Sequence, residues 1–183
     1  MDKTAVVFQS KYGATKRYAE WIAEELSCDI FDGKNVKVTD LEPYSIIVYG
    51  GGLYAGGVIG IDLITKNFDK LCNKKLVVFT CGLADPMDKT NTDSIKKSLN
   101  EVFTPQMQDK IKVFYLRGAI DYSKLGLTHK AMMAILHKIV TKKDQESLRS
   151  EDKEMIDTYG KAVDFTDKTT IMPITNYVRD ICT

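Results

Sequence analysis

Four continuous runs of apolar residues recur along the chain, and they constrain its fold more than any other feature. They are AVVF (5–8), SIIVYG (45–50), KLVVFTCG (75–82) and KVFYLRGAI (112–120). Runs without alternating polar residues are typical of strands that are buried on both faces of a parallel sheet. A weaker run, CDIFDG (28–33), predicts a further strand at the edge of this sheet.

Segments with helical periodicity separate the predicted strands. Their apolar residues recur at spacings of three and four, which is the pattern of a helix with one buried face. These residues are Tyr18, Ile22 and Leu26, then Ile61, Ile64, Phe68 and Leu71, and then Ile95, Leu99 and Val102. The alternation of strands and helices predicts an α/β fold, a doubly wound five-stranded parallel sheet with helices on both faces.

The pattern changes after Ile120, where we expect an added helical segment at about 121–150. The segment starts with a predicted helix near 128–142, and a charge-rich stretch follows. Another helix is predicted from Ser150. It should stop at Gly160, because glycine suits the left-handed turn that follows a helix end.

Composition and charge exclude several classes of protein. A chain of 183 residues suits a single domain over 1–183, and 26 basic against 25 acidic residues give no field that would favour nucleic acid. The four cysteines form no C-x-x-C pair and the N-terminus lacks the pattern of a signal peptide, which indicates the cytoplasm. No apolar run approaches the ~20 residues of a membrane span, and no metal site is predicted.

The loop after the first strand predicts a site for an anion. It comprises Ser10, Lys11, Tyr12, Gly13, Ala14 and Thr15, and it leads into a predicted helix. A helix N-terminus presents unpaired N–H groups and the positive end of the helix dipole, which together suit a phosphate. The alternative is an ordinary turn in which Ser10 or Thr15 only caps the helix. The chain lacks both G-x-x-x-x-G-K-[ST] and a G-x-G-x-x-G after the first strand, which argues against ATP hydrolysis and dinucleotide binding.

The second loop, YGGGLYAGGVIG (49–60), has six glycines in twelve positions. Residues without a Cβ atom indicate that the backbone approaches a flat ligand closely. Tyr54 lies within this loop and is a candidate for stacking on a ring system. The alternative is a surface tyrosine that covers the end of the sheet.

Two further loops also follow predicted strands. In TCGLADPMD (80–88), Asp85 sets a turn, and Cys81 is expected to be a packed thiol because no second cysteine is near. In the loop after the last strand, Tyr122 is a candidate contact for a ligand. The equally open alternative is that Asp121 caps a helix and Tyr122 packs.

The stretches FQSKYGAT, YGGGLYAGG and FTCGLADP resemble the three flavin-binding loops of the flavodoxin superfamily. The stretches SKYGAT followed by KRYAEWIAEEL, GLYAG, and RGAIDYSKLGLTHKAMMAIL are most similar to flavodoxin-domain proteins related to quinone-dependent protoporphyrinogen dehydrogenase. This resemblance implies a flavodoxin-like fold and FMN as the cofactor. It implies cofactor binding by Ser10, Lys11, Tyr12, Gly13, Ala14, Thr15, Gly51, Gly52, Leu53, Tyr54, Ala55, Gly56, Thr80, Cys81, Gly82, Leu83 and Asp85.

The resemblance also implies a function, for which alternatives stay open. The first is an oxidoreductase that passes electrons between an organic substrate, such as a porphyrinogen, and an acceptor such as a quinone. The second is a non-enzymatic electron carrier with a redox partner, and the third is a domain without flavin. No catalytic residue is assigned, and His129 and His137 are expected at the surface. Since the third loop has no aromatic residue, Tyr54 is expected to be the only aromatic residue that stacks on the flavin.

The stretch 124–143 has five lysines and no acidic residue, and many of its other residues are apolar. A basic amphipathic helix of this kind can lie on a lipid surface, which predicts peripheral contact with the inner face of a membrane or with an apolar partner. The alternative is a helix that packs onto the sheet and exposes its lysines. The sequence does not indicate an oligomeric state.

Overall fold

A parallel sheet forms the centre of the protein in a computed structural model, which describes residues 2–54 and 57–182. Five parallel strands lie in the order β2-β1-β3-β5-β6, and a short β4 pairs antiparallel with β3. The strands are β1 (Thr4–Gln9), β2 (Asp29–Asp32), β3 (Ile46–Tyr54), β4 (Gly57–Val58), β5 (Lys75–Gly82) and β6 (Ile111–Arg117). This order confirms the predicted doubly wound sheet, whose order reverses between β1 and β3.

Alternate residues of the buried strands pack on opposite faces of the sheet. Val6 and Val48 belong to a core with α1 (Ala14–Leu26) and α8 (Met172–Ile181). Their neighbours, such as Val7, face a second core that contains residues of the helices between β4 and β6. Those helices are α2 (Asp62–Thr65), α3 (Phe68–Leu71), α4 (Lys89–Val102) and α5 (Pro105–Lys110). Single turns of 3-10 helix lie at Val38–Leu41, Tyr122–Lys124, Gln145–Ser147 and Lys168–Ile171.

Two of the predicted elements are interrupted in the structure. The helix expected around 61–71 is divided into α2 and α3, because Asn67 has a non-helical backbone and its side chain donates to the Leu63 carbonyl at 3.0 Å. The strand expected over 112–120 breaks at Gly118, whose N–H donates to the Gly82 carbonyl at 2.6 Å. The chain therefore leaves the main sheet at Gly118.

The sequence indicated that the third strand would end where the glycines of the second loop begin, and this expectation is wrong. β3 instead continues to Tyr54 and turns back into β4. A Cβ atom on Gly50 would lie 2.1 Å from the Phe79 ring, and one on Gly51 would lie 2.2 Å from Val58. At these two positions the close approach is therefore to protein atoms of the sheet and not to a ligand.

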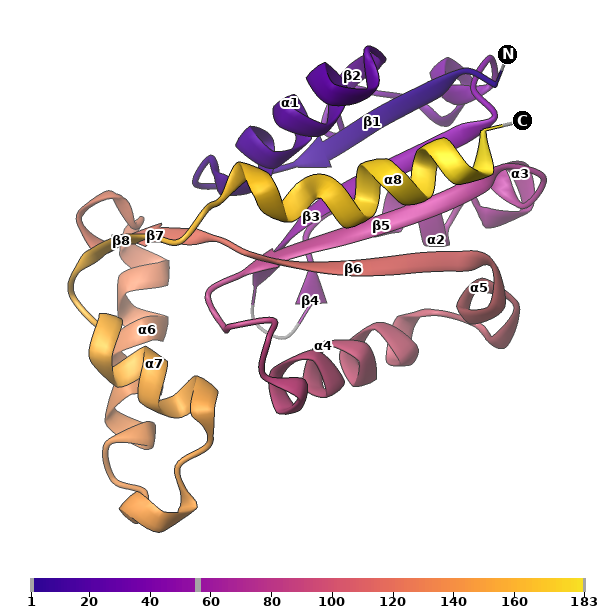
Figure 1. The fold of residues 1–183 in the computed structure, drawn as a ribbon. Helices are drawn as coiled ribbons and strands as arrows, with labels where there is room; N and C mark the ends of the chain where they lie inside the picture. Colours follow the sequence, from indigo (N-terminus) through magenta and orange to yellow (C-terminus); the bar gives the residue numbers. More distant parts are fainter. Residues whose placement is uncertain (1, 55–56, 183) are drawn as a thin grey trace.

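The segment between β6 and α8 forms a lobe beyond the carboxyl ends of the strands (Figure 1). It contains β7 (Ala119–Asp121), α6 (Leu127–Val140), α7 (Ser150–Thr158) and β8 (Ala162–Asp164). β7 and β8 pair antiparallel and close the lobe, which makes it longer than the added segment expected at about 121–150. α6 packs with α7 off the end of the sheet, so the alternative of a helix packed onto the sheet is wrong.

We predict that Gly50→Ala destabilises the fold. The new methyl group would overlap the buried Phe79 ring, and overpacking of this kind costs about 1–3 kcal/mol of unfolding free energy. Urea denaturation of the purified protein measures the change. Gly57→Ala is the matched control, because the nearest atom to its Cβ is the Tyr54 carbonyl oxygen at 3.8 Å. Equal stabilities of the two variants would contradict the packing explanation.

Candidate functional site

A cavity of about 420 Å³ lies at the carboxyl ends of the strands, between the sheet and the lobe. In an open parallel sheet this edge, at the reversal of strand order, is where ligands bind. Many of the residues expected at a cofactor site line the cavity. They are Ser10, Lys11, Tyr12, Ala14, Thr15, Gly52, Leu53, Tyr54, Cys81, Gly82 and Leu83.

The remaining expected residues are placed differently. Gly13, Gly51, Thr80 and Asp85 belong to the described part of the chain but do not line the cavity. Thr80 is buried within β5, and Asp85 lies in the turn before α4. Ala55 and Gly56 lie outside the described residues.

The first loop directs the N-terminus of α1 at the cavity. Gly13 precedes the helix with a φ of 98°, a left-handed conformation that favours glycine. Ser10 Oγ accepts a hydrogen bond from the Gly13 N–H at 3.0 Å, which holds the turn. In the described structure, no side chain caps α1 and its first turn has no acidic residue. The positive end of the helix dipole is therefore available to an anionic group such as a phosphate.

His129 lies in the wall of the cavity, so the expectation that it would be a surface residue is wrong. Only 4% of the residue is exposed. It reaches from α6 to the first loop, where its Nε2 lies 2.8 Å from Lys11 Nζ and its Nδ1 contacts the Tyr12 hydroxyl. Its ring also packs at 4.2 Å, centroid to centroid, against the Tyr54 ring. Sequence periodicity alone could not reveal this, because Lys11 and Tyr12 are more than a hundred residues away and Tyr54 is also distant in the chain.

These contacts determine the protonation of His129. An ammonium group has no lone pair, so Lys11 donates and Nε2 of His129 accepts. The proton of the neutral imidazole then lies on Nδ1 and points to the Tyr12 hydroxyl. Burial lowers the pKa of His129, and the charge of Lys11 lowers it further. The residue is therefore uncharged at neutral pH.

Arg117 connects the third loop to the lobe. Its Nε donates to the Leu83 carbonyl at 3.1 Å, and its terminal nitrogens lie 3.6 Å from an Asp85 oxygen and 3.2 Å from a Glu154 oxygen. The guanidinium also lies over the Phe165 ring at 3.8 Å. Asp85 is thus an ion-pair partner that orders its loop. This single side chain fixes the third loop against α7 and the segment after β8.

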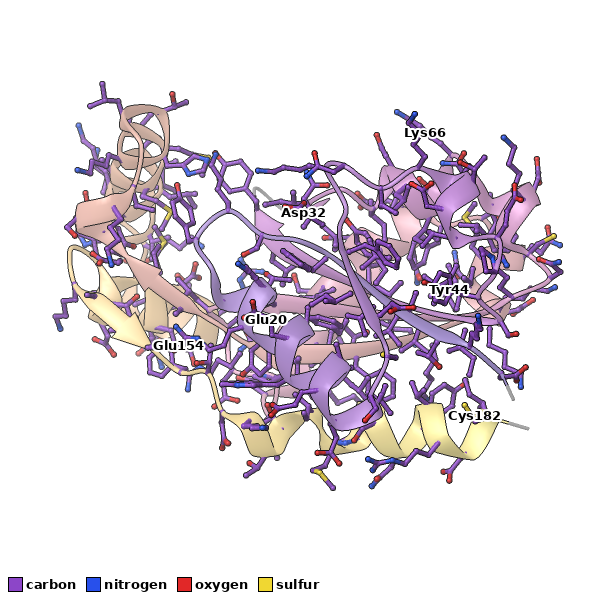
Figure 2. The ribbon with its side chains drawn as sticks, turned by 90° about the horizontal axis from the view of Figure 1, so that it is seen from above. Glu20, Asp32, Tyr44, Lys66, Glu154 and Cys182 are labelled. Carbon is purple, nitrogen blue, oxygen red and sulfur yellow. The ribbon has the colours of Figure 1, made fainter. Side chains whose placement is uncertain are left out.

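Glu154 contributes a carboxylate to the cavity wall from α7. Its Oε1 faces Arg117, and its Oε2 accepts from the Asp85 N–H at 3.2 Å. Burial away from water raises the pKa of the Glu154 carboxyl group, and the charge of Arg117 opposes this rise. Figure 2 shows Glu154 at the lobe end of the molecule, with Cys182 toward the other end. Nothing in the sequence around Glu154 indicated this position.

Cys81, Asp121 and Tyr122 have packing or capping roles in the structure. Burial raises the pKa of Cys81 to about 12, so its thiol stays protonated at neutral pH. Asp121 accepts from the Ser123 N–H at 3.0 Å, as a capping residue does. Tyr122 is buried against Tyr159 at 5.2 Å and does not line the cavity. The structural alternative therefore holds for the last two residues.

The lobe and α4 supply cavity residues that the sequence did not identify. They are mainly apolar, with several small polar side chains on α4. They include Asn91, Ser94, Ile95, Ser98, Ile120, Leu125, Met132, Met133, Leu136, Met155, Thr158 and Phe165. His137, also expected at the surface, is half-buried and stacks on Tyr159 at 3.9 Å. The far wall of the cavity is thus apolar and rich in methionine, which packs adaptably.

The chain belongs to the flavodoxin domain family, whose pattern it matches over residues 5–147. Solved structures that match it include the flavodoxin WrbA-like protein from Agrobacterium tumefaciens, which is 25% identical with a TM-score of 0.41. That alignment covers 50% of this chain and 66% of the other, just under two thirds of its length. No curated protein matches the chain significantly.

Two further structures are more distant in sequence. Oxidised Flavodoxin 1 from Bacillus cereus is 16% identical, with a TM-score of 0.40 and coverage of 63% of this chain and 84% of that one. A flavoprotein in complex with FMN from Lactobacillus acidophilus is 17% identical, with a TM-score of 0.42 and coverage of 64% and 93%.

We predict that His129 titrates below the usual histidine pKa of 6.5 and carries its proton on Nδ1 at neutral pH. Nitrogen-detected NMR of the imidazole reports both properties. Because the folded-state pKa is lowered, the contribution of neutral His129 to stability is complete above pH 6.5 and is lost as the pH falls through the folded-state pKa. Lys11→Met should raise this pKa, whereas Lys130→Met, an exposed change on the same helix, should not. A pKa at or above 6.5 would refute the assignment.

Proposed function

We propose that this protein is an FMN-binding oxidoreductase. Membership of the flavodoxin domain family and the position of the cavity at the reversal of strand order support FMN as the ligand. The phosphate would be held by Ser10, Thr15 and the N–H groups at the start of α1. Tyr54 would cover one face of the flavin ring, and the loop 81–83 would lie at its edge. Bound FMN supplies the transfer of one or two electrons, so the protein needs only to bind and orient the reactants.

The observation that carries the enzymatic proposal is the apolar wall of the cavity. α6 and α7 cover the side away from the three loops with Met132, Met133 and Met155. An electron carrier needs an exposed flavin edge, whereas a covered apolar chamber suits an organic substrate. We propose that the substrate is a reduced organic compound such as a porphyrinogen and that the acceptor is a quinone, in the reducing cytoplasm that the cysteine pattern indicates.

The alternative is a flavodoxin-type electron carrier, which would present acidic residues around the flavin to its redox partner. The acidic residues around the cavity have internal roles here, and Glu154 in the cavity wall faces Arg117 at 3.2 Å. Asp85 faces Arg117 at 3.6 Å, and Asp121 faces Lys124 at 3.1 Å. Asp88 caps α4 by accepting from the Thr90 N–H at 2.8 Å. These contacts favour the enzyme over the carrier.

We predict that the combined change Ser10→Ala and Thr15→Val weakens FMN binding at least about tenfold. The change removes two hydroxyl groups that can donate to a charged phosphate, and each such hydrogen bond contributes about 1.5–3 kcal/mol. Fluorescence titration of the apoprotein measures the affinity. Riboflavin, which lacks the phosphate, is the matched control and should bind the variant and the unaltered protein equally. Unchanged FMN affinity would contradict the placement of the phosphate in this loop.

The enzymatic proposal predicts turnover by the isolated protein. FMN-loaded protein should oxidise a porphyrinogen anaerobically in the presence of a quinone, and porphyrin fluorescence follows the product. Met155→Trp should fill the lobe side of the cavity and lower kcat/KM by roughly tenfold. It should leave FMN affinity unchanged, since Met155 belongs to none of the three loops. If FMN binds but no turnover occurs, while electrons pass between two redox proteins, the carrier is correct.

A further inference from the structure

The outward face of α6 combines exposed apolar side chains with lysines. Leu127, Ile135 and Ile139 are 87%, 62% and 55% exposed. Lys138 and Lys142 are also exposed. At 100° per residue the four of these side chains that belong to α6 fall within an arc of about 120° that is distinct from the side facing the cavity. Lys142 follows just after the end of the helix at Val140. An exposed row of aliphatic residues on an otherwise polar surface marks a site of contact.

The charge on this face is positive. The stretch 124–143 has no acidic residue. Two of its lysines are engaged within the lobe, because Lys124 lies 3.1 Å from Asp121 and Lys143 lies 2.9 Å from Asp152. Lys138 on α6 and Lys142 just after its end are instead exposed. The surface that complements this face must therefore be both apolar and anionic.

We propose that the outward face of α6 binds the surface of an anionic lipid bilayer. The helix has 14 residues and is thus about 21 Å long, enough to lie flat on the interface. In that position Ile135 and Ile139 enter the acyl boundary while the lysine ammonium groups reach the lipid phosphates. Among the described residues, no helix is long and apolar enough to cross a membrane.

The composition of the face favours lipid over a protein partner. Centres of protein interfaces are enriched in aromatic residues and arginine and depleted of lysine. The outward face has aliphatic residues and lysines, and α6 contains neither arginine nor an aromatic residue other than its two histidines, of which His129 faces the cavity. Lysine contributes to binding of anionic lipid through its charge alone, without a fixed geometry.

A neighbouring side of the same helix lines the cavity through Met132, Met133 and Leu136. Binding through the outward face therefore places the cavity beside the bilayer. A lipid-soluble electron acceptor would then reach the cavity without crossing water. This last consequence rests on the proposed function, whereas the lipid binding itself does not.

Co-sedimentation of the full chain with vesicles tests the proposal. The protein without added flavin should bind vesicles that contain phosphatidylglycerol about tenfold or more tightly than pure phosphatidylcholine vesicles, and salt should weaken the binding. The double variants Lys138→Glu with Lys142→Glu, and Ile135→Ser with Ile139→Ser, should each lose most of this binding. The control is Lys96→Glu with Lys97→Glu, which makes the same change of charge on exposed positions of α4 and should bind as the unaltered protein does.

Several results would overturn the proposal. One is failure to bind anionic vesicles at low salt, and another is equal loss of binding in the α4 control. A third is self-association in sedimentation velocity that the Ile135 and Ile139 variant abolishes, which would make a second copy the occupant. Circular dichroism confirms that each variant is folded. FMN titration of the same variants tests the proposed function separately. Loss of lipid binding with unchanged FMN affinity concerns this proposal alone.

Discussion

The parallel pairing of β1 with β3 is the constraint on which the candidate site depends. The pairing extends from Thr4 opposite Ile46 to Gln9 opposite Gly51. It brings the end of one strand, with the N-terminus of α1, beside the end of another that carries Tyr54. A shift of two residues in this register would keep both cores buried yet would separate the turn before α1 from the aromatic ring. On the other side of β3, Gly50 lies opposite Phe79 of β5 and admits its ring, which contributes to the packing of β3 against β5.

The lobe depends in turn on a small junction around Arg117 and Gly118. Arg117 contacts both acids that face the third loop, and its carbonyl accepts from the buried Tyr18 hydroxyl at 2.8 Å. Tyr18 Oη also accepts from the Asp167 N–H at 3.1 Å, where the chain returns from the lobe. One buried tyrosine of α1 therefore contacts both ends of the lobe. The cavity walls keep their relative positions because these contacts converge on the sheet.

Much of the fold could be predicted from the sequence because residues close together in the chain specify its strands and helices. Continuous apolar runs marked the buried strands, and the glycine and hydroxyl residues of the first loop indicated a turn that the structure places beside the cavity. His129 and Glu154 could not be found this way, because their positions depend on Lys11 and Arg117, which are distant in the chain. The pairing of β7 with β8 was missed for a similar reason. Each strand has three residues and no strong apolar pattern, so only the partner reveals it.

The β7 and β8 pair also has a consequence for how this architecture can vary. Ala119 lies opposite Asp164, so the chain leaves the α/β core and re-enters it at a single point. The two connections between the core and the lobe therefore lie side by side, as the two ends of a short hairpin do. This holds for any segment between β7 and β8. Insertions or deletions within the lobe would alter the shape and polarity of the chamber while the buried cores keep their contacts. The fold therefore separates the residues that bury the two cores from the residues that shape the chamber.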